Sequence, residues 1–304
     1  MSYTTKPFEE LDLIDDFLMN AAAGDEEVGE EFSRTLLEGL LQRKFGDIEV
    51  SIQSIRLPDS PNHRGIRLDV EIHEHETKDG TAKLKNIYDI EPNKRTTVNL
   101  PRHNRFYQAK IDSRNLESGE ADFSILPNLF IIMITNYDPF GYDYMLYTVH
   151  NCCIEIPELE YKDGLSFLYF NTTGTKGGNS AIKSLLNFIQ NSKISNVTDE
   201  VTKKLLNCIN RVKVSPEMRM EYMKWDAVLY YERMDGIEEG LTKGRIEGQL
   251  EAKIEDIFSF LEDLGDIPDE LKDKIQNETD LEILSKWLKL AGRAESIEDF
   301  IEKM

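Results

Sequence analysis

The sequence predicts an α/β layered domain followed by an all-helical C-terminal region. Two observations indicate this division. Up to about residue 176, segments with the period-two alternation of strands are mixed with segments that repeat every three to four residues, as helices do. From residue 177 onward only helical patterns follow. We therefore expect a core over residues 1–176 and a helical region over residues 177–304.

The first predicted element is an amphipathic helix within Glu26–Lys44. Its apolar residues recur at spacings of three and four, which places them on one face of a helix. Charged residues occupy most of the other face. The apolar positions are Val28, Phe32, Leu36, Leu37, Leu40 and Leu41.

Three strand-like segments come next and predict an antiparallel meander. They are IEVSIQSI (residues 48–55), GIRLDVEIH (65–73) and NIYDIE (86–91). The turn-rich sequence HETKDG follows the second of them, which favours a reversal of the chain there. The three segments are therefore expected to pair in sequence order.

A helix and a buried strand complete the predicted core. The helix runs roughly from Arg102 to Glu117 and follows Pro101, a residue that is favoured in the first helical turn. The segment LFIIMITNY (residues 129–137) is almost continuously apolar, as expected of a central strand covered on both faces. TVHNCCIEI (148–156) is a further strand candidate.

The C-terminal region contains helical patterns only, including a long run from Pro216 through Glu262. Within it, glycines recur every four residues and so form a stripe without side chains on a helix. Each glycine costs about 1 kcal/mol relative to alanine in a helix interior. The stripe indicates either close helix packing in a homodimer or a flexible charged linker. Its members are Gly236, Gly240, Gly244 and Gly248.

Composition limits the functions that the chain can have. The formal net charge is −21, which repels polyanions at long range, so any nucleic-acid contact must be local. No segment approaches the roughly 18 apolar residues of a membrane span, and no signal peptide is recognisable, so we expect a cytoplasmic protein. The three cysteines lack metal-type spacing, so we expect reduced thiols and no zinc site.

The predicted strands carry a set of acidic residues. Alternation places Asp69 on the polar face of its strand, and Asp89, Glu91 and Asn93 on one face of theirs. If the two strands are neighbours, Asp69 and Glu91 lie side by side. Paired carboxylates are costly unless a proton or cation neutralises them, and such oxygen ligands suit Mg²⁺. The alternative is an acidic strand face in contact with solvent.

The order of motifs resembles the PD-(D/E)xK nuclease family, in its branch of recombination-promoting, transposase-like nucleases. GIRLDVEI, YDIE, LPRHNRFYQAKID and NYDPFG follow in the same order at compatible spacing, and the resemblance covers most of the chain. It implies a restriction-endonuclease-like core, with a mixed central sheet flanked by helices, that hydrolyses DNA with Mg²⁺ or Mn²⁺. It further implies Asp69 and Glu91 as metal ligands and Glu38 as a helix-borne carboxylate at the same site.

One position departs from the pattern of that family. The family places Lys or Gln two residues after the glutamate, whereas this chain has Asn93. An amide carries no charge, and this side chain is one methylene shorter than Gln. Pro92 also removes a backbone donor, which is typical of an edge or irregular strand. The leading hypothesis is a metal-dependent DNA endonuclease; the alternative is an inactive nuclease-fold protein that acts in binding or oligomerisation.

A local basic cluster lies in the predicted helix after Pro101. Phosphate contact is one interpretation, and an amphipathic helix with solvated charges, which turns Phe106 and Ile111 inward, is the other. Both fit the residue pattern equally well. The candidate DNA-binding residues are Arg102, Arg105, Tyr107 and Gln108.

Overall fold

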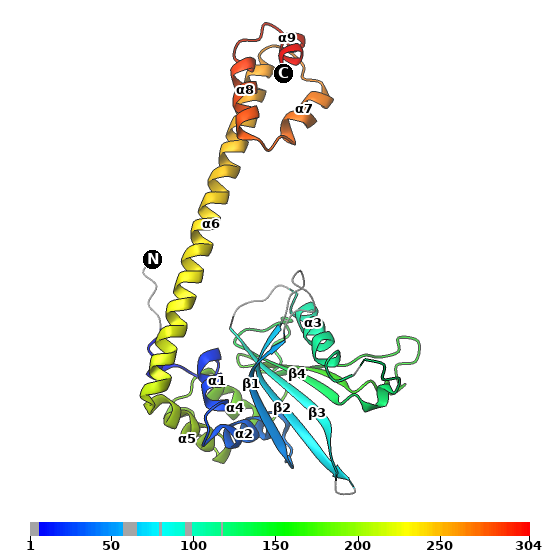
Figure 1. The fold of residues 1–304 in the computed structure, drawn as a ribbon, viewed down its shortest axis with the longest axis vertical. Helices are drawn as coiled ribbons and strands as arrows, with labels where there is room; N and C mark the ends of the chain where they lie inside the picture. The colour runs from blue at the N-terminus through cyan, green and yellow to red at the C-terminus, as the bar shows by residue number, and fades with distance from the viewer. Residues whose placement is uncertain (1–5, 57–65, 79–80, 95–98, 117) are drawn as a thin grey trace. The chain divides into compact units, whose positions relative to one another are not determined.

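The structure is a computed structural model that describes residues 6–56, 66–78, 81–94, 99–116 and 118–304 (Figure 1). Within these ranges the side chains of residues 52–56, 66–69, 78 and 232 are not described. The chain divides into two compact units, Met1–Met223 and Lys224–Met304. The first unit holds the sheet and is the part that positions the candidate site.

The core of the first unit is a six-stranded mixed sheet with strand order β1-β2-β3-β4-β6-β5. The first three strands pair antiparallel in sequence order, as the meander prediction required. β4 runs parallel to β3, β6 runs parallel to β4, and β5 closes the edge antiparallel to β6. The strands are β1 (Ile48–Arg56), β2 (Ile66–Lys78), β3 (Thr81–Asn93), β4 (Asn128–Thr135), β5 (Leu146–Val149) and β6 (Leu165–Asn171).

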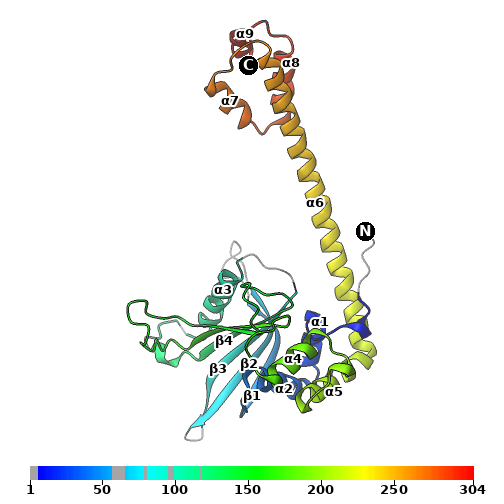
Figure 2. The ribbon, with the colours of Figure 1, turned by 180° about the vertical axis from the view of Figure 1, so that it is seen from behind.

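Helices flank both faces of this sheet, which confirms the predicted α/β class. Helix α3 (Leu100–Asp112) connects the parallel strands β3 and β4 and lies on one side of the sheet. Figures 1 and 2 show α1, α2, α4 and α5 on the other side. Their bounds are Asp16–Ala23, Gly29–Leu41, Ser180–Gln190 and Glu200–Val214, and short 3₁₀ helices span Phe8–Glu10, Phe123–Ile125 and Ile194–Asn196.

Alternation along β3 assigns its side chains to these two faces. Ile87 belongs to a buried cluster on the α3 side, which also contains Leu100 and Ile111 of α3. Tyr88 lies on the opposite face, where Phe45, just after α2, packs edge-on against its ring at 5.4 Å. The strand is therefore buried on both sides from residue 86 to residue 92.

The first unit extends beyond the predicted boundary at residue 176. α4 and α5 pack on α2, where a side chain at Gly39 would come within 2.8 Å of Leu185 and 3.1 Å of Val201. Hence these helices belong to the same unit as the sheet. The predicted strand over residues 148–156 is also only partly correct, because β5 ends at Val149 and the segment that follows is exposed.

The second unit is helical, as predicted. Helix α6 (Pro216–Glu262) runs across the boundary between the units, and its C-terminal part packs with α7 (Asp269–Gln276), α8 (Leu281–Ala291) and α9 (Ile297–Lys303). α6 is helical through all four glycines, which does not match a flexible linker. Within the described ranges, no helix combines the length and the apolar character that a membrane span requires.

Candidate active site on strands β2 and β3

Three buried carboxylates occupy neighbouring positions on the α3 face of β2 and β3. Glu71 of β2 lies directly opposite Asp89 of β3, and alternation puts Glu91 on the same face two residues further along. The exposed fractions of these residues are 2%, 0% and 7%. Carboxylates buried at adjacent positions are costly unless donors, a proton or a cation neutralise them.

Asp69 falls outside the described side chains, although its backbone belongs to β2. The register of β2 and β3 is described as far as Val70 opposite Ile90. Asp69 and Glu91 are the next residues of the two strands. The side-by-side placement of Asp69 and Glu91 stays a prediction, as does the position of the Asp69 carboxylate.

A histidine accompanies the buried acids. The Nε2 atom of His73 lies 2.9 Å from Oε1 of Glu71, two residues apart on the same face of β2. Sequence alternation places both residues on that face, but the buried role of Glu71 was not predicted. The sequence feature that indicates this role is the position of Glu71 between Asp69 and His73 on the polar face of the strand.

Asn93 lies at the end of β3 and is half-buried. Its amide oxygen accepts a hydrogen bond from the hydroxyl of Tyr137 at 3.2 Å. The neighbouring Lys94 forms an ion pair with Asp15, which precedes α1 on the other side of the sheet. Asn93 therefore supplies an amide where the resembled family has Lys or Gln, and Lys94 is bound elsewhere.

The loop after Tyr137 is held rigidly by Asp138. Its carboxylate accepts hydrogen bonds from the backbone NH groups of Phe140, Gly141 and Asp143 and from the hydroxyl of Tyr147. Burial alone raises the pKa of Asp138, but these donors outweigh it and lower the pKa below its usual range. The segment NYDPFG is thus an ordered turn beside Asn93.

Helix α3 supplies both exposed cations and inward-facing groups. Arg102 and Arg105 are exposed, so they are accessible to a phosphate backbone. Tyr107 is half-buried with its ring centroid 4.1 Å from that of His103, and the Gln108 amide nitrogen donates to Asp112 at 3.0 Å. Of the four predicted DNA-binding residues, the two arginines are the more accessible.

Glu38 lies away from the carboxylates of β3. Its side chain accepts hydrogen bonds from the Lys44 ammonium at 2.6 Å and from the backbone NH of Phe45 at 3.3 Å. Burial raises the pKa of Glu38, but these two donors lower it overall. Because Phe45 packs against Tyr88 on the opposite face from Asp89, the structure does not bring Glu38 to the predicted site.

The opposite face also carries a buried acid, Glu74, which sequence reasoning missed. Its carboxylate accepts from Arg43 at 2.8 Å, Asn86 at 2.6 Å and Tyr88 at 2.7 Å. Burial alone raises the pKa of Glu74, but the three donors outweigh it and lower the pKa to about 2. Arg43 and Glu74 are 31 residues apart in the sequence, so no local pattern predicts the pair.

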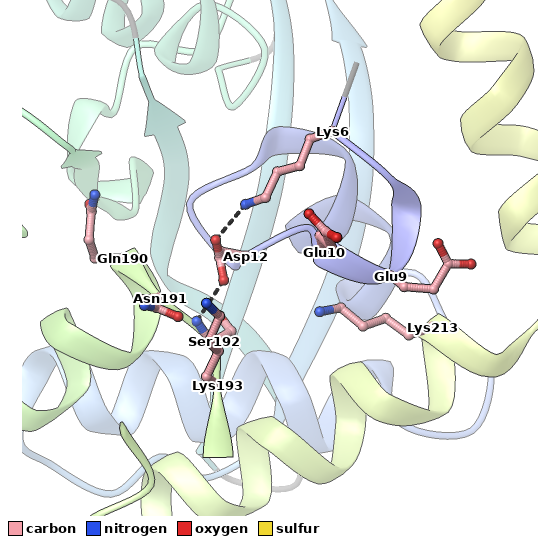
Figure 3. A pocket seen from close by; sticks show the side chains of 9 residues that line it. All are labelled: Lys6, Glu9, Glu10, Asp12, Gln190, Asn191, Ser192, Lys193 and Lys213. Atoms are coloured by element: carbon pink, nitrogen blue, oxygen red, sulfur yellow. Dashed lines mark hydrogen bonds and ion pairs between the residues drawn. The ribbon is translucent and has the colours of Figure 1, made fainter. Parts of the chain in front are cut away.

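A cavity of about 600 Å³ lies near the N-terminal segment and the end of α4 (Figure 3). Figure 3 shows Lys6 directed at Asp12, which also accepts from the backbone NH of Ser192. Lys213 donates to the backbone carbonyl of Leu11 at 2.6 Å, and burial lowers the pKa of its ammonium. These groups fasten the N-terminal segment to the end of α4 and to α5, which gives the charged side chains around the cavity a structural role.

The donor set on β2 and β3 has the chemistry of a site for a hard divalent cation. Glu71, Asp89 and Glu91 offer carboxylate oxygens, which Mg²⁺ and Mn²⁺ prefer over nitrogen or sulfur. Among the described residues, no three His, Cys, Asp or Glu side chains are arranged to hold a metal ion. The carboxylate oxygens of the described residues are therefore of the kind that such an ion binds. A complete set of ligands would also need the carboxylate of Asp69.

Comparisons of the chain with protein-family models, with curated proteins and with solved structures gave no match.

Proposed function

We propose that the first unit is a metal-dependent DNA endonuclease of the PD-(D/E)xK type. The observation that carries the proposal is the buried carboxylate cluster on adjacent strands, in which Glu71 faces Asp89 and Glu91 follows on the same face. A solvated acidic surface does not explain these side chains, because they are buried. Oxygen donors concentrated on two neighbouring strands are what a cation-assisted phosphodiesterase requires.

The order of elements supports the finer proposal of a restriction-endonuclease-like core. Helix α2 precedes the antiparallel strands β1, β2 and β3, and α3 then leads to β4, which is parallel to β3. The mixed sheet is flanked by helices on both sides. This is the arrangement that the resemblance of the motifs implies.

In this proposal Asp69 and Glu91 hold Mg²⁺ or Mn²⁺, with Asp89 and Glu71 beside them. When bound, the cation lowers the pKa of a coordinated water and offsets negative charge at the phosphate. The protein positions the groups around the cation. The hydroxyl of Tyr137 donates a hydrogen bond to the amide oxygen of Asn93 and so fixes the direction of that amide. In this proposal the amide of Asn93 orients a water or a phosphate oxygen.

The exposed side chains of α3 provide the local attraction that an acidic protein needs to bind DNA. The chain has a formal net charge of −21, so long-range attraction does not bring DNA to its surface. Arg102 and Arg105 are exposed on the helix that covers the carboxylate face. We propose that they contact the phosphate backbone and position it toward β3.

A second function, that of a disabled nuclease fold acting in binding or oligomerisation, is favoured by Asn93. Its side chain is shorter than the Lys or Gln of the resembled family, and its oxygen is already bonded to Tyr137. A group in this position that is too short to reach the attacking water would leave the fold intact and slow the reaction. This alternative predicts that cleavage is slow or absent.

Cleavage of supercoiled and linear DNA by the purified full chain tests the proposal in the presence of Mg²⁺ or Mn²⁺. We expect Asp69→Ala and Glu91→Gln to lose at least about 100-fold in rate, because each removes a charged ligand. Glu38→Gln serves as the matched control, and retained cleavage would also remove Glu38 from the site. Asn93→Gln is expected to increase the rate.

Three outcomes separate the two functions. Cleavage by the wild type that is lost in Asp69→Ala supports the nuclease. Inactive wild type with active Asn93→Gln identifies a disabled site. Inactivity of every variant, together with no uptake of Mn²⁺, would contradict the nuclease and favour the binding protein.

A further inference from the structure

Helix α6 carries an apolar stripe that the described contacts of the chain do not cover. Six positions separated alternately by four and three residues define this stripe, which we call the seam. All six are exposed, and the exposed fraction of Leu241 is 71%. The seam consists of Met223, Ala227, Tyr230, Met234, Ile237 and Leu241.

The spacing of the seam identifies the kind of partner that it fits. A repeat of 3.5 residues keeps apolar side chains facing a second helix that winds around the first with the same repeat. A stripe that packed on a globular surface would follow the 3.6-residue period and would be wider. The four-three alternation therefore favours a helix of the same pattern as the occupant.

The stretch containing the seam also needs stabilisation that its own sequence does not provide. It includes Gly236 and Gly240, and Gly244 and Gly248 follow it, each at a cost of about 1 kcal/mol relative to alanine. A side chain built on any of these glycines would meet nothing within 4 Å. Gly244 and Gly248 continue the spacing of the seam, so a partner helix can approach closely there.

Charges along the edges of the seam are self-complementary. Asp226 and Arg233 precede seam positions on one edge, and Glu238 follows Ile237 on the other. A parallel second copy brings Arg233 beside Glu238, and an antiparallel copy can bring it beside Asp226. Either orientation of an identical helix therefore forms an attractive pair across the contact.

We propose that the seam on α6 is the contact surface of a homodimer, occupied by the same helix of a second copy of this chain. Closed two-fold symmetry is the commonest arrangement for identical chains and uses one self-complementary surface. The proposal assigns the exposed residues of α6 a function and does not depend on DNA cleavage. It requires only that the seam be buried between two copies.

Sedimentation equilibrium of the full chain over a range of concentrations tests this proposal with two matched variants. Ile237 is 46% exposed and lies in the seam, whereas Val228 is 56% exposed and lies outside it. We expect the wild type and Val228→Lys to dimerise alike. Ile237→Lys should raise the dissociation constant by at least about 100-fold, because a dimer would bury two unpaired ammonium groups.

Far-UV circular dichroism establishes that the variants keep the helical content of the wild type. Met234→Lys is a second seam variant and decides the matter if Ile237→Lys does not fold. The proposal is overturned if the wild type is monomeric at every concentration, which would leave a different protein as the partner. It is also overturned if both seam variants dimerise like the wild type.

Discussion

The two faces of strands β2 and β3 both bury acidic side chains, but they differ in how those acids are grouped. On the face toward α2, the carboxylate of Glu74 meets Arg43, Asn86 and Tyr88. On the face toward α3, Glu71, Asp89 and Glu91 are grouped on neighbouring positions. The acid with a full set of donors serves the fold, whereas the group of acids on adjacent strands is the basis of the proposed cation site.

The largest effect is expected on the α2 face. Arg43→Met removes the guanidinium and leaves the Glu74 carboxylate buried, so the free energy of unfolding should fall by about 3 kcal/mol. Urea denaturation measures this loss. As a control, Lys85→Met removes the exposed partner of Glu76 and should cost less than about 1 kcal/mol. Equal losses in both variants would contradict the structural role of Glu74.

The ion pair of Arg43 and Glu74 should also make the free energy of unfolding depend on pH, with a somewhat smaller effect. The folded-state pKa of Glu74 is about 2, below the ordinary value of 4.5, so its contribution is fully present above pH 4.5. It is lost as the pH falls from 4.5 toward 2. The stability difference between wild type and Glu74→Gln should therefore shrink by about 2 kcal/mol over this window. A constant difference would mean that Glu74 is not held ionised by its partners.

The contrast between the faces also shows how far the sequence could lead. Alternation within GIRLDVEIH and NIYDIE was enough to predict the meander and to place Asp89 and Glu91 on one face. It did not predict Glu74, because the strand was expected to end at His73 and β2 continues to Lys78. It also could not predict the partner of Glu74, since Arg43 reaches it only through the tertiary fold.

Helix periodicity had a similar limit. It predicted α2 correctly but could not show which face of the sheet the helix covers, and Glu38 was therefore assigned to a site from which the structure separates it. The domain boundary was displaced for a related reason. The sequence pattern of α4 and α5 predicts the start of a helical region. Their close contact with Gly39 instead places them in the unit that contains the sheet.

On the α3 face, stability should depend on divalent cations. A ligand present at 100 times its dissociation constant stabilises the folded state by about 2.7 kcal/mol. Millimolar Mn²⁺ should therefore raise the melting temperature by an amount that corresponds to a stabilisation of at most this size. Glu91→Gln should lose the rise, because it removes a charged oxygen ligand. Glu38→Gln should keep it. A rise of equal size in Glu91→Gln would place the cation elsewhere.

The central claim is that the carboxylates of β2 and β3 form a cation site, and calorimetric titration of Mn²⁺ into the full chain tests it most directly. The account predicts saturable binding by the wild type that weakens at least tenfold in Asp69→Ala and in Glu91→Gln, while Glu74→Gln binds like the wild type. Equal binding by all four proteins, or no binding by the wild type, would contradict it.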